Sequence, residues 1–232
     1  MISDKEINNW RKSWKRKSNG KLLSITGVSN IDDIIDIAVQ KGYAPSIQNT
    51  AIKQYKYDSK KLAVPRKDCE ELLKKEIKKI YDETNITEEK FEEWESNLAS
   101  EIREKYKQNG IEHYTYGNAQ KWINMTIKFV FSSENVDYTK QLFNVCYLPI
   151  DRIIQDKAYK ELGVKKLPVA WSKCDDWNEI QSYQKRIKDA IIEKTNYDSR
   201  LWWECNAWTV NIEQVAKNIL NKHKKAFVEL AK

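Results

Sequence analysis

The chain has 232 residues, of which 41% are hydrophobic and 32% are charged, and its formal net charge is +7. This composition excludes a disordered chain, and the absence of a membrane-length apolar run or an opening signal peptide predicts a cytoplasmic protein without membrane partners. The positive charge favours a polyanionic partner such as nucleic acid, although a lysine-rich composition alone produces the same surplus.

Helices dominate the first half of the chain. Capping signals and apolar periodicity predict helices over residues 3–19 and 29–42, a third that starts at Asp68, and a fourth over residues 87–109. Gly42 is predicted to end the second helix. The lysine-rich stretch between these helices, residues 43–67, is predicted to form a short helix with loops.

The most apolar helical segment follows, over residues 117–131. A polar insert over residues 132–144 separates it from a helix predicted near residues 150–162. Further helices are predicted after Ser172 or Asp175, over residues 201–205, and from residue 211 onward. The segment 117–131 is apolar on more than one face, so we expect it to be central and buried.

These elements predict an all-α, multi-helix globular fold with two helical layers around a cleft. Six glycines and four prolines are few for a fold built on tight β-turns. The sequence contains neither an internal repeat nor a set of alternating strands. We expect one domain over residues 1–232, with two lobes, 1–110 and 111–232, as the alternative division.

The cysteines do not suggest a metal site. None of the four is part of a C-x-x-C pair, and the chain has only two histidines. We expect buried, reduced thiols and neither a metal nor a cofactor. Asp175 and Asp176 are interpreted as a helix cap, and a Cys–His–Asp enzyme with His113 as base has no supporting spacing.

Two charged residues occupy unusual positions. Lys121 lies in the first turn of the apolar helix, and Asp151 follows Leu148-Pro149-Ile150 at the expected start of a buried helix. Such a lysine and acid can form a catalytic pair. The structural alternatives are a solvated lysine and an ordinary N-cap, which are common roles for these residues.

The two segments resemble the helix-hairpin-helix DNA glycosylases, in particular the 8-oxoguanine glycosylase type. Tyr116-Gly117-Asn118-Ala119-Gln120-Lys121 corresponds to the glycine-bearing hairpin and its catalytic lysine. Leu148-Pro149-Ile150-Asp151-Arg152 corresponds to the segment that carries the catalytic aspartate. The resemblance implies a helical protein that excises a damaged or modified base from DNA.

The resemblance also implies roles for individual residues. Asp151 would stabilise the oxocarbenium-like transition state, and the neutral amine of Lys121 would attack C1′ to form a Schiff base in a glycosylase/lyase. A helix N-terminus disfavours positive charge and so favours the neutral amine. The residues that would contact double-stranded DNA around a flipped-out base are Tyr116, Gly117, Asn118, Gln120, Trp122, Arg152, Trp171 and Trp177.

Two other functions fit the same sequence. The first is a non-catalytic nucleic-acid-binding protein with a glycosylase-like fold. The second is a helical interaction protein of phage or defence origin. The glycosylase hypothesis requires Lys121 and Asp151 to line one cleft, and it predicts a monomer that associates with the nucleoid if the source is bacterial.

Overall fold

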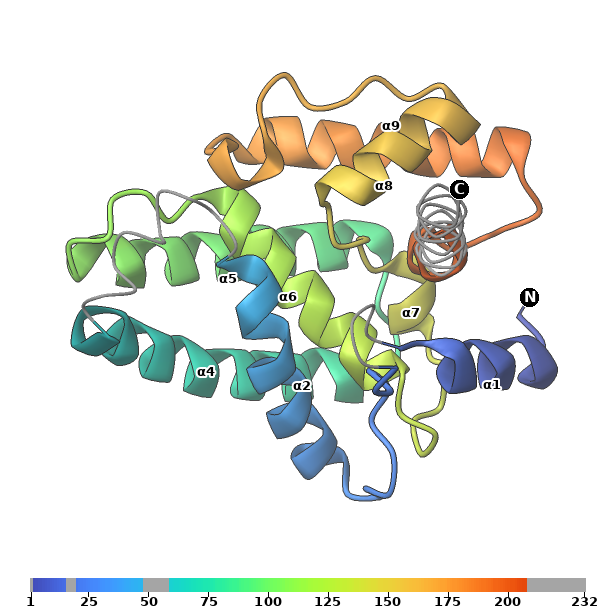
Figure 1. Ribbon diagram of the computed structural model, residues 1–232, viewed down its shortest axis with the longest axis horizontal. Coiled ribbons are helices and arrows are strands. Elements are labelled where there is room, and N and C mark those ends of the chain that lie inside the picture. Colours follow the sequence, from blue (N-terminus) through green and yellow to red (C-terminus); the bar gives the residue numbers. More distant parts are fainter. Residues whose placement is uncertain (1, 16–19, 48–58, 208–232) are drawn as a thin grey trace, which may run out of the picture.

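A computed structural model describes residues 2–15, 20–47 and 59–207 of the chain (Figure 1). These ranges are helical and contain no strand, apart from one isolated antiparallel bridge between Lys15 and Leu22. The predicted all-α fold is therefore confirmed. Among these helices, none has the length and apolar character of a membrane span.

Ten named elements follow one another along the described ranges, and residues 200–207 are also helical. The elements are α1 (Asp4–Ser13), α2 (Ile31–Ser46), α4 (Ser59–Asp82), α5 (Glu88–Gln108), α6 (Tyr116–Phe131), α7 (Gln141–Val145), α8 (Arg152–Lys157), the π-helical η2 (Ala158–Leu162), the 3-10 helix η3 (Trp171–Lys173) and α9 (Trp177–Lys194).

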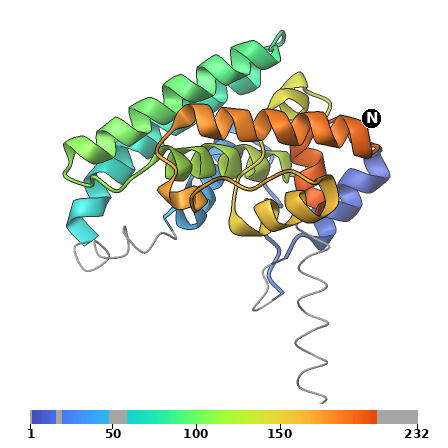
Figure 2. The ribbon, with the colours of Figure 1, turned by 90° about the horizontal axis from the view of Figure 1, so that it is seen from above.

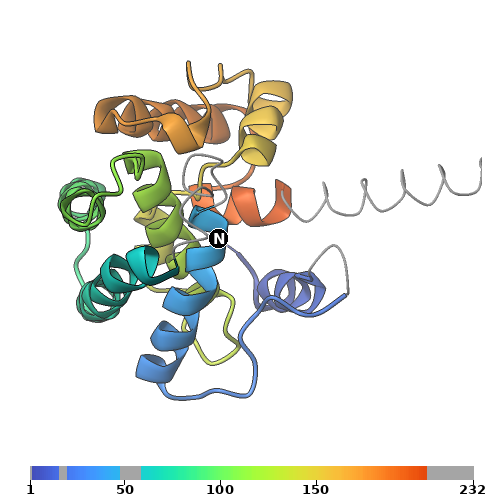
Figure 3. The same cartoon turned by 60° about the vertical axis from the view of Figure 1, so that its left-hand side comes forward.

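Helix α6 forms the centre of the molecule. Every residue from Gly117 to Phe131 is buried, as its apolar character on several faces predicts. Figures 1 and 3 show α2, α4 and α5 on one side of α6 and α8 and α9 on the other. Helix α2 packs along α6, while α4 and α5 lie side by side in Figure 2. The side chains of α6 are therefore within reach of both groups of helices.

The predicted caps of two helices are confirmed. Ser3 and Glu6 form the capping box of α1, in which each side chain bonds the other residue's backbone N–H. The Thr87 side chain accepts from the Lys90 N–H at the start of α5. Both helices thus begin where local hydrogen bonding predicts.

Three predicted boundaries are wrong. Helix α1 ends at Ser13 rather than at residue 19, because the chain becomes extended at Trp14 and Lys15 pairs with Leu22. Helix α2 continues through Gly42 to Ser46, because this glycine serves close packing: an added Cβ would lie 2.8 Å from the Thr126 hydroxyl oxygen. Helix α4 begins at Ser59, so Asp68 lies inside it rather than at its start. The helix predicted from residue 211 lies outside the described residues.

The buried apolar side chains form two clusters. The first extends from Ile7 to Tyr147, and the second begins at Leu148 and covers α8, η2 and α9. Helix 200–207 contributes to both, with Trp202 in the first cluster and Trp203 in the second. The division falls between residues 147 and 148.

Candidate functional site

The N-terminus of α6 is held by backbone contacts that only glycine permits. The Gly117 N–H donates to the Cys174 carbonyl at 2.9 Å. A Cβ at Gly117 would lie 1.7 Å from the Trp171 carbonyl oxygen, a distance that no side chain tolerates. Because glycine has no Cβ, residues 171–174 can lie directly against the first turn of α6.

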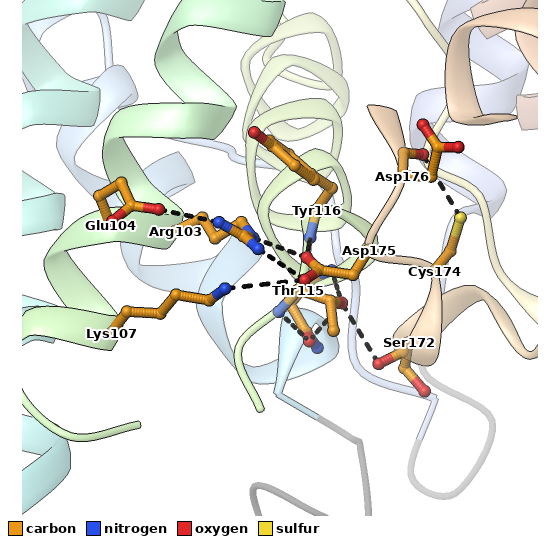
Figure 4. A network of polar contacts seen from close by, with 10 residues as sticks. Arg103, Glu104, Lys107, Thr115, Tyr116, Ser172, Cys174, Asp175 and Asp176 are labelled. Carbon is orange, nitrogen blue, oxygen red and sulfur yellow. Dashed lines mark hydrogen bonds and ion pairs between the residues drawn. The ribbon is translucent and has the colours of Figure 1, made fainter. Parts of the chain in front are cut away.

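A network centred on Asp175 fixes the same segment from the other side (Figure 4). The Asp175 carboxylate accepts two hydrogen bonds of 2.6 Å from the Arg103 guanidinium and one of 3.2 Å from the Tyr116 N–H. The Lys107 ammonium lies 3.7 Å away. Burial opposes the charge on Asp175, but these partners outweigh it and lower its pKa. The acid therefore serves as a bridge between α5 and α6.

Lys121 and Asp151, 30 residues apart, are in direct contact. The Lys121 Nζ lies 2.9 Å from Asp151 Oδ2 and 3.2 Å from the Pro149 carbonyl oxygen. The lysine side chain is 4% exposed and the aspartate side chain 20%. Asp151 is also the N-cap of α8, since its Oδ1 accepts from the Ile154 N–H at 2.8 Å. The acid thus combines a structural cap with an ion pair.

Gln120 aligns the two segments that carry this pair. Its Oε1 accepts from the Ile150 N–H at 3.2 Å, and its Nε2 donates to the Ile150 carbonyl at 3.2 Å. The same amide also donates to the Gly117 carbonyl at 3.0 Å. Because both backbone groups of Ile150 are bonded to α6, the position of Asp151 relative to Lys121 is fixed.

The electrostatic environment keeps Asp151 ionised. Burial alone opposes its charge, but the Lys121 ammonium, the Ile154 N–H and the charge of Lys128 together outweigh burial and lower the pKa of Asp151. At neutral pH the site therefore presents a carboxylate.

A cavity of about 720 Å³ opens beside this pair. The exposed Ala44 and Arg152 lie at its mouth, and Lys121 and Asp151 line its wall. The other lining residues are Trp14, Leu23, Lys41, Pro45, Met125, Lys128, Phe129, Ile153, Trp171, Ser172 and Glu204. A pocket of this size with apolar walls and a few charged groups is typical of a small-molecule or base-sized ligand.

A second ion pair lines the same cavity, and we did not predict it from the sequence. The Lys128 Nζ lies 2.6 Å from Glu204 Oε2, and the two side chains are 2% and 1% exposed. Burial raises the pKa of Glu204, against the opposing effect of the Lys128 charge. The spacing of seven residues between Lys121 and Lys128 places both on one face of α6, which is a signal that could have identified Lys128.

The predicted DNA-contacting residues divide into three groups. Arg152 and Trp171 line the cavity. Tyr116 and Trp177 are partly buried and lie outside the cavity lining, with ring centroids 5.8 Å apart. The others are in the interior and are no longer assigned to a DNA contact: Gly117, Asn118, Gln120 and Trp122.

The interior residues have partners within the protein. The Asn118 amide donates to the Ser46 carbonyl at 2.6 Å, and the Trp122 indole donates to the Val39 carbonyl at 2.9 Å. Arg11, at the start of a basic stretch, is buried and donates to the Phe131 and Val136 carbonyls. These side chains stabilise the fold instead of facing a ligand.

The cysteines are buried free thiols, as predicted. Burial raises the pKa of Cys69 to about 12, so this thiol is not a nucleophile at neutral pH. Within the ranges that the structure describes, no three potential metal-ligating side chains come together.

Comparisons of the chain with protein-family models, with curated proteins and with solved structures give no match. The cavity and its two ion pairs are the features of the molecule that bear on its function.

Proposed function

We propose that this protein is a DNA glycosylase that excises a damaged or modified base. The observation that carries the proposal is the contact between Lys121 and Asp151, 2.9 Å apart on the wall of a cavity of about 720 Å³. The sequence resemblance requires these two residues to meet in one cleft. A base flipped out of the duplex needs a pocket of comparable character, with apolar walls and a few polar groups.

Asp151 has the central chemical role in this proposal. Cleavage breaks the C1′–N bond, whose electron pair leaves with the base, and water then adds hydroxide to C1′ and supplies a proton to the product. Positive charge develops on the sugar as the bond breaks. An ionised carboxylate beside C1′ stabilises that charge mainly in the transition state, which is the requirement for rate acceleration. The lowered pKa of Asp151 supports this role.

Lys121 has a secondary role. Attack on C1′ by the lysine would form a Schiff base, but it requires the neutral amine. In the structure the Lys121 amine is engaged in an ion pair with the Asp151 carboxylate. We therefore propose hydrolytic base release as the main reaction and the glycosylase/lyase reaction as an additional activity.

Double-stranded DNA is the proposed partner, bound by a monomer. Arg152 is exposed at the mouth of the cavity and can contact a phosphate beside the flipped nucleotide. Trp171, also at the cavity, offers an aromatic ring against the base or sugar. Because phosphate contacts release counterions, we expect the affinity for DNA to fall steeply as the salt concentration rises.

The test is base release from a panel of duplexes that each carry one damaged or modified base. We expect the wild-type protein to release at least one of these bases. Asp151→Asn should reduce the release rate by at least about 100-fold, as expected for removing a transition-state interaction. Asparagine also caps helices well and keeps a side-chain oxygen that accepts from the buried Lys121, so the variant should remain folded and bind duplex DNA.

Asp176→Asn is the matched control. Asp176 caps α9, its side chain accepts from the Asn178 N–H at 2.9 Å, and it does not line the cavity. This variant should release base at the wild-type rate. An Asp151→Asn variant as active as its parent would contradict the proposal. Salt-sensitive DNA binding without base release would favour the non-catalytic nucleic-acid-binding alternative, and no DNA binding would favour the interaction protein.

A further inference from the structure

The ion pair between Lys128 and Glu204 has no evident structural advantage. The two side chains are 2% and 1% exposed, so both charges have left water. Removing two charges from water is expensive, and an apolar pair of similar volume is often equally or more stable. A buried pair of this kind therefore invites a search for a ligand that it serves.

The position of the pair identifies the ligand's location. Lys128 and Glu204 line the same cavity as Lys121 and Asp151. The Lys128 ammonium lies 4.8 Å from the centroid of the Trp14 ring, which also lines the cavity. A planar ligand in the cavity would thus present its edge near an ammonium and a carboxylate.

The spacing along α6 agrees with the dimensions of a nucleotide. Seven residues separate Lys121 from Lys128, which corresponds to about 10 Å along the helix axis and to the same helix face. A nucleotide whose sugar lies beside Lys121 and Asp151 would extend its base toward Lys128 and Glu204. The two ion pairs would then contact opposite ends of one nucleotide.

We infer that Lys128 and Glu204 select a base with a lactam edge, that is, an N–H bonded to a carbonyl carbon. The inference rests on the proposed glycosylase function. Lys128 donates to the lactam oxygen, and Glu204 accepts from the lactam N–H. The 2.6 Å between Lys128 Nζ and Glu204 Oε2 places the donor and the acceptor side by side, as adjacent lactam groups require.

Charge favours a lactam over the other edges that bases present. The lactam carbonyl is a stronger acceptor than a ring nitrogen, and the lactam N–H is an acidic donor. Hydrogen bonds between such groups and charged partners are the stronger kind. A base without the lactam would offer no such groups to the ammonium and the carboxylate, so the pair would bind it less well than a lactam base.

The experiment compares matched duplexes. Hypoxanthine and uracil carry the lactam, whereas unsubstituted purine and 1,N6-ethenoadenine lack it. A duplex with a tetrahydrofuran abasic analogue tests DNA binding without a base. We expect the wild-type protein to release a lactam base at least about tenfold faster than either base without the lactam.

The variant that removes the pair is Lys128→Met combined with Glu204→Met, which keeps the net charge unchanged. It should lose at least about tenfold in release of the preferred lactam base, with unchanged affinity for the abasic duplex. The control is Lys157→Met with Glu161→Met, which removes a partly exposed ion pair outside the cavity. This control should release the preferred lactam base at the wild-type rate and bind the abasic duplex with the wild-type affinity.

The outcomes separate the inference from the proposed function. Preferential release of purine or ethenoadenine by the wild type overturns the lactam assignment but leaves the glycosylase in place. An unchanged lactam preference in the folded double variant would likewise overturn the lactam assignment and leave the glycosylase in place. Release of no base from any duplex overturns both.

Discussion

Two ion pairs on one face of α6 behave differently although both consist of a lysine and an acid. The pKa of Asp151 is lowered and the pKa of Glu204 is raised, despite ammonium partners at 2.9 Å and 2.6 Å. Burial raises both values. Asp151 also accepts the Ile154 N–H and has a 20% exposed side chain, whereas the Glu204 side chain is 1% exposed. At Asp151 the Lys121 charge together with the Ile154 N–H outweighs burial, whereas at Glu204 burial prevails over the shorter ion pair.

The largest effect is expected from breaking the more buried pair. Glu204→Met leaves Lys128 as an uncompensated buried charge and should lower the free energy of unfolding by about 3–5 kcal/mol. Adding Lys128→Met removes that charge and should restore stability to within about 1 kcal/mol of the wild type. Urea unfolding of the three proteins provides the measurement. Equal stabilities of the single and double variants would contradict this account of the pair.

A third buried acid sharpens the comparison, because its hydrogen-bond partner in the described part of the chain is a neutral amide. Glu95 is fully buried, and its Oε1 accepts from the Asn124 amide at 2.7 Å. Burial raises its pKa to about 8, against the smaller opposing effects of Asn124 and Arg200. The folded protein therefore keeps a proton between about pH 4.5 and 8 that the unfolded chain releases.

The sign of the pH dependence follows from this proton. Over that window the contribution of Glu95 to stability falls as pH rises. Glu95→Gln removes the dependence and should be more stable than the wild type by about 3 kcal/mol at pH 7. Unfolding free energies measured from pH 5 to pH 8 test this expectation. Parallel curves for the two proteins would show that Glu95 does not carry the raised pKa.

The smallest effect is expected from changing Arg152 at the mouth of the cavity. Arg152 follows Asp151 directly but lies at the mouth of the cavity, in solvent. Arg152→Ala should weaken DNA binding several-fold and reduce the slope of log affinity against log salt by about 1. Arg186→Ala, which changes an exposed arginine on α9 outside this cavity, is the matched control. Equal salt slopes for both variants would remove Arg152 from the proposed interface.

The sequence predicted the parts of the site that local patterns determine. The apolar run and its flanking polar residues identified α6, and the resemblance identified Lys121 and Asp151 as residues that should meet. Glu204 was missed because a buried acid inside Leu201-Trp202-Trp203-Glu204-Cys205 has no local pattern that distinguishes it from a surface acid. Its role depends on Lys128, which is 76 residues earlier in the chain.

Glycine shows the same limit of sequence-based prediction. Gly42 was interpreted as a helix end, since glycine often follows the last helical turn. In the structure its function is to let α2 approach Thr126 and Trp122 of α6. Gly117 was interpreted as part of a DNA-contacting hairpin, but it accommodates the carbonyl of Trp171. Only the tertiary fold reveals which neighbour a glycine accommodates.

Helix 200–207 has a consequence for the order of events during synthesis. It supplies Trp202 to one apolar cluster and Trp203 to the other, and Arg200 bonds the Val145 carbonyl near the point where the clusters divide. A nascent chain emerges from the ribosome N-terminus first. Neither cluster can be complete until residues 200–207 have emerged, so both halves of the protein expose apolar surface to chaperones while the preceding residues are being synthesised.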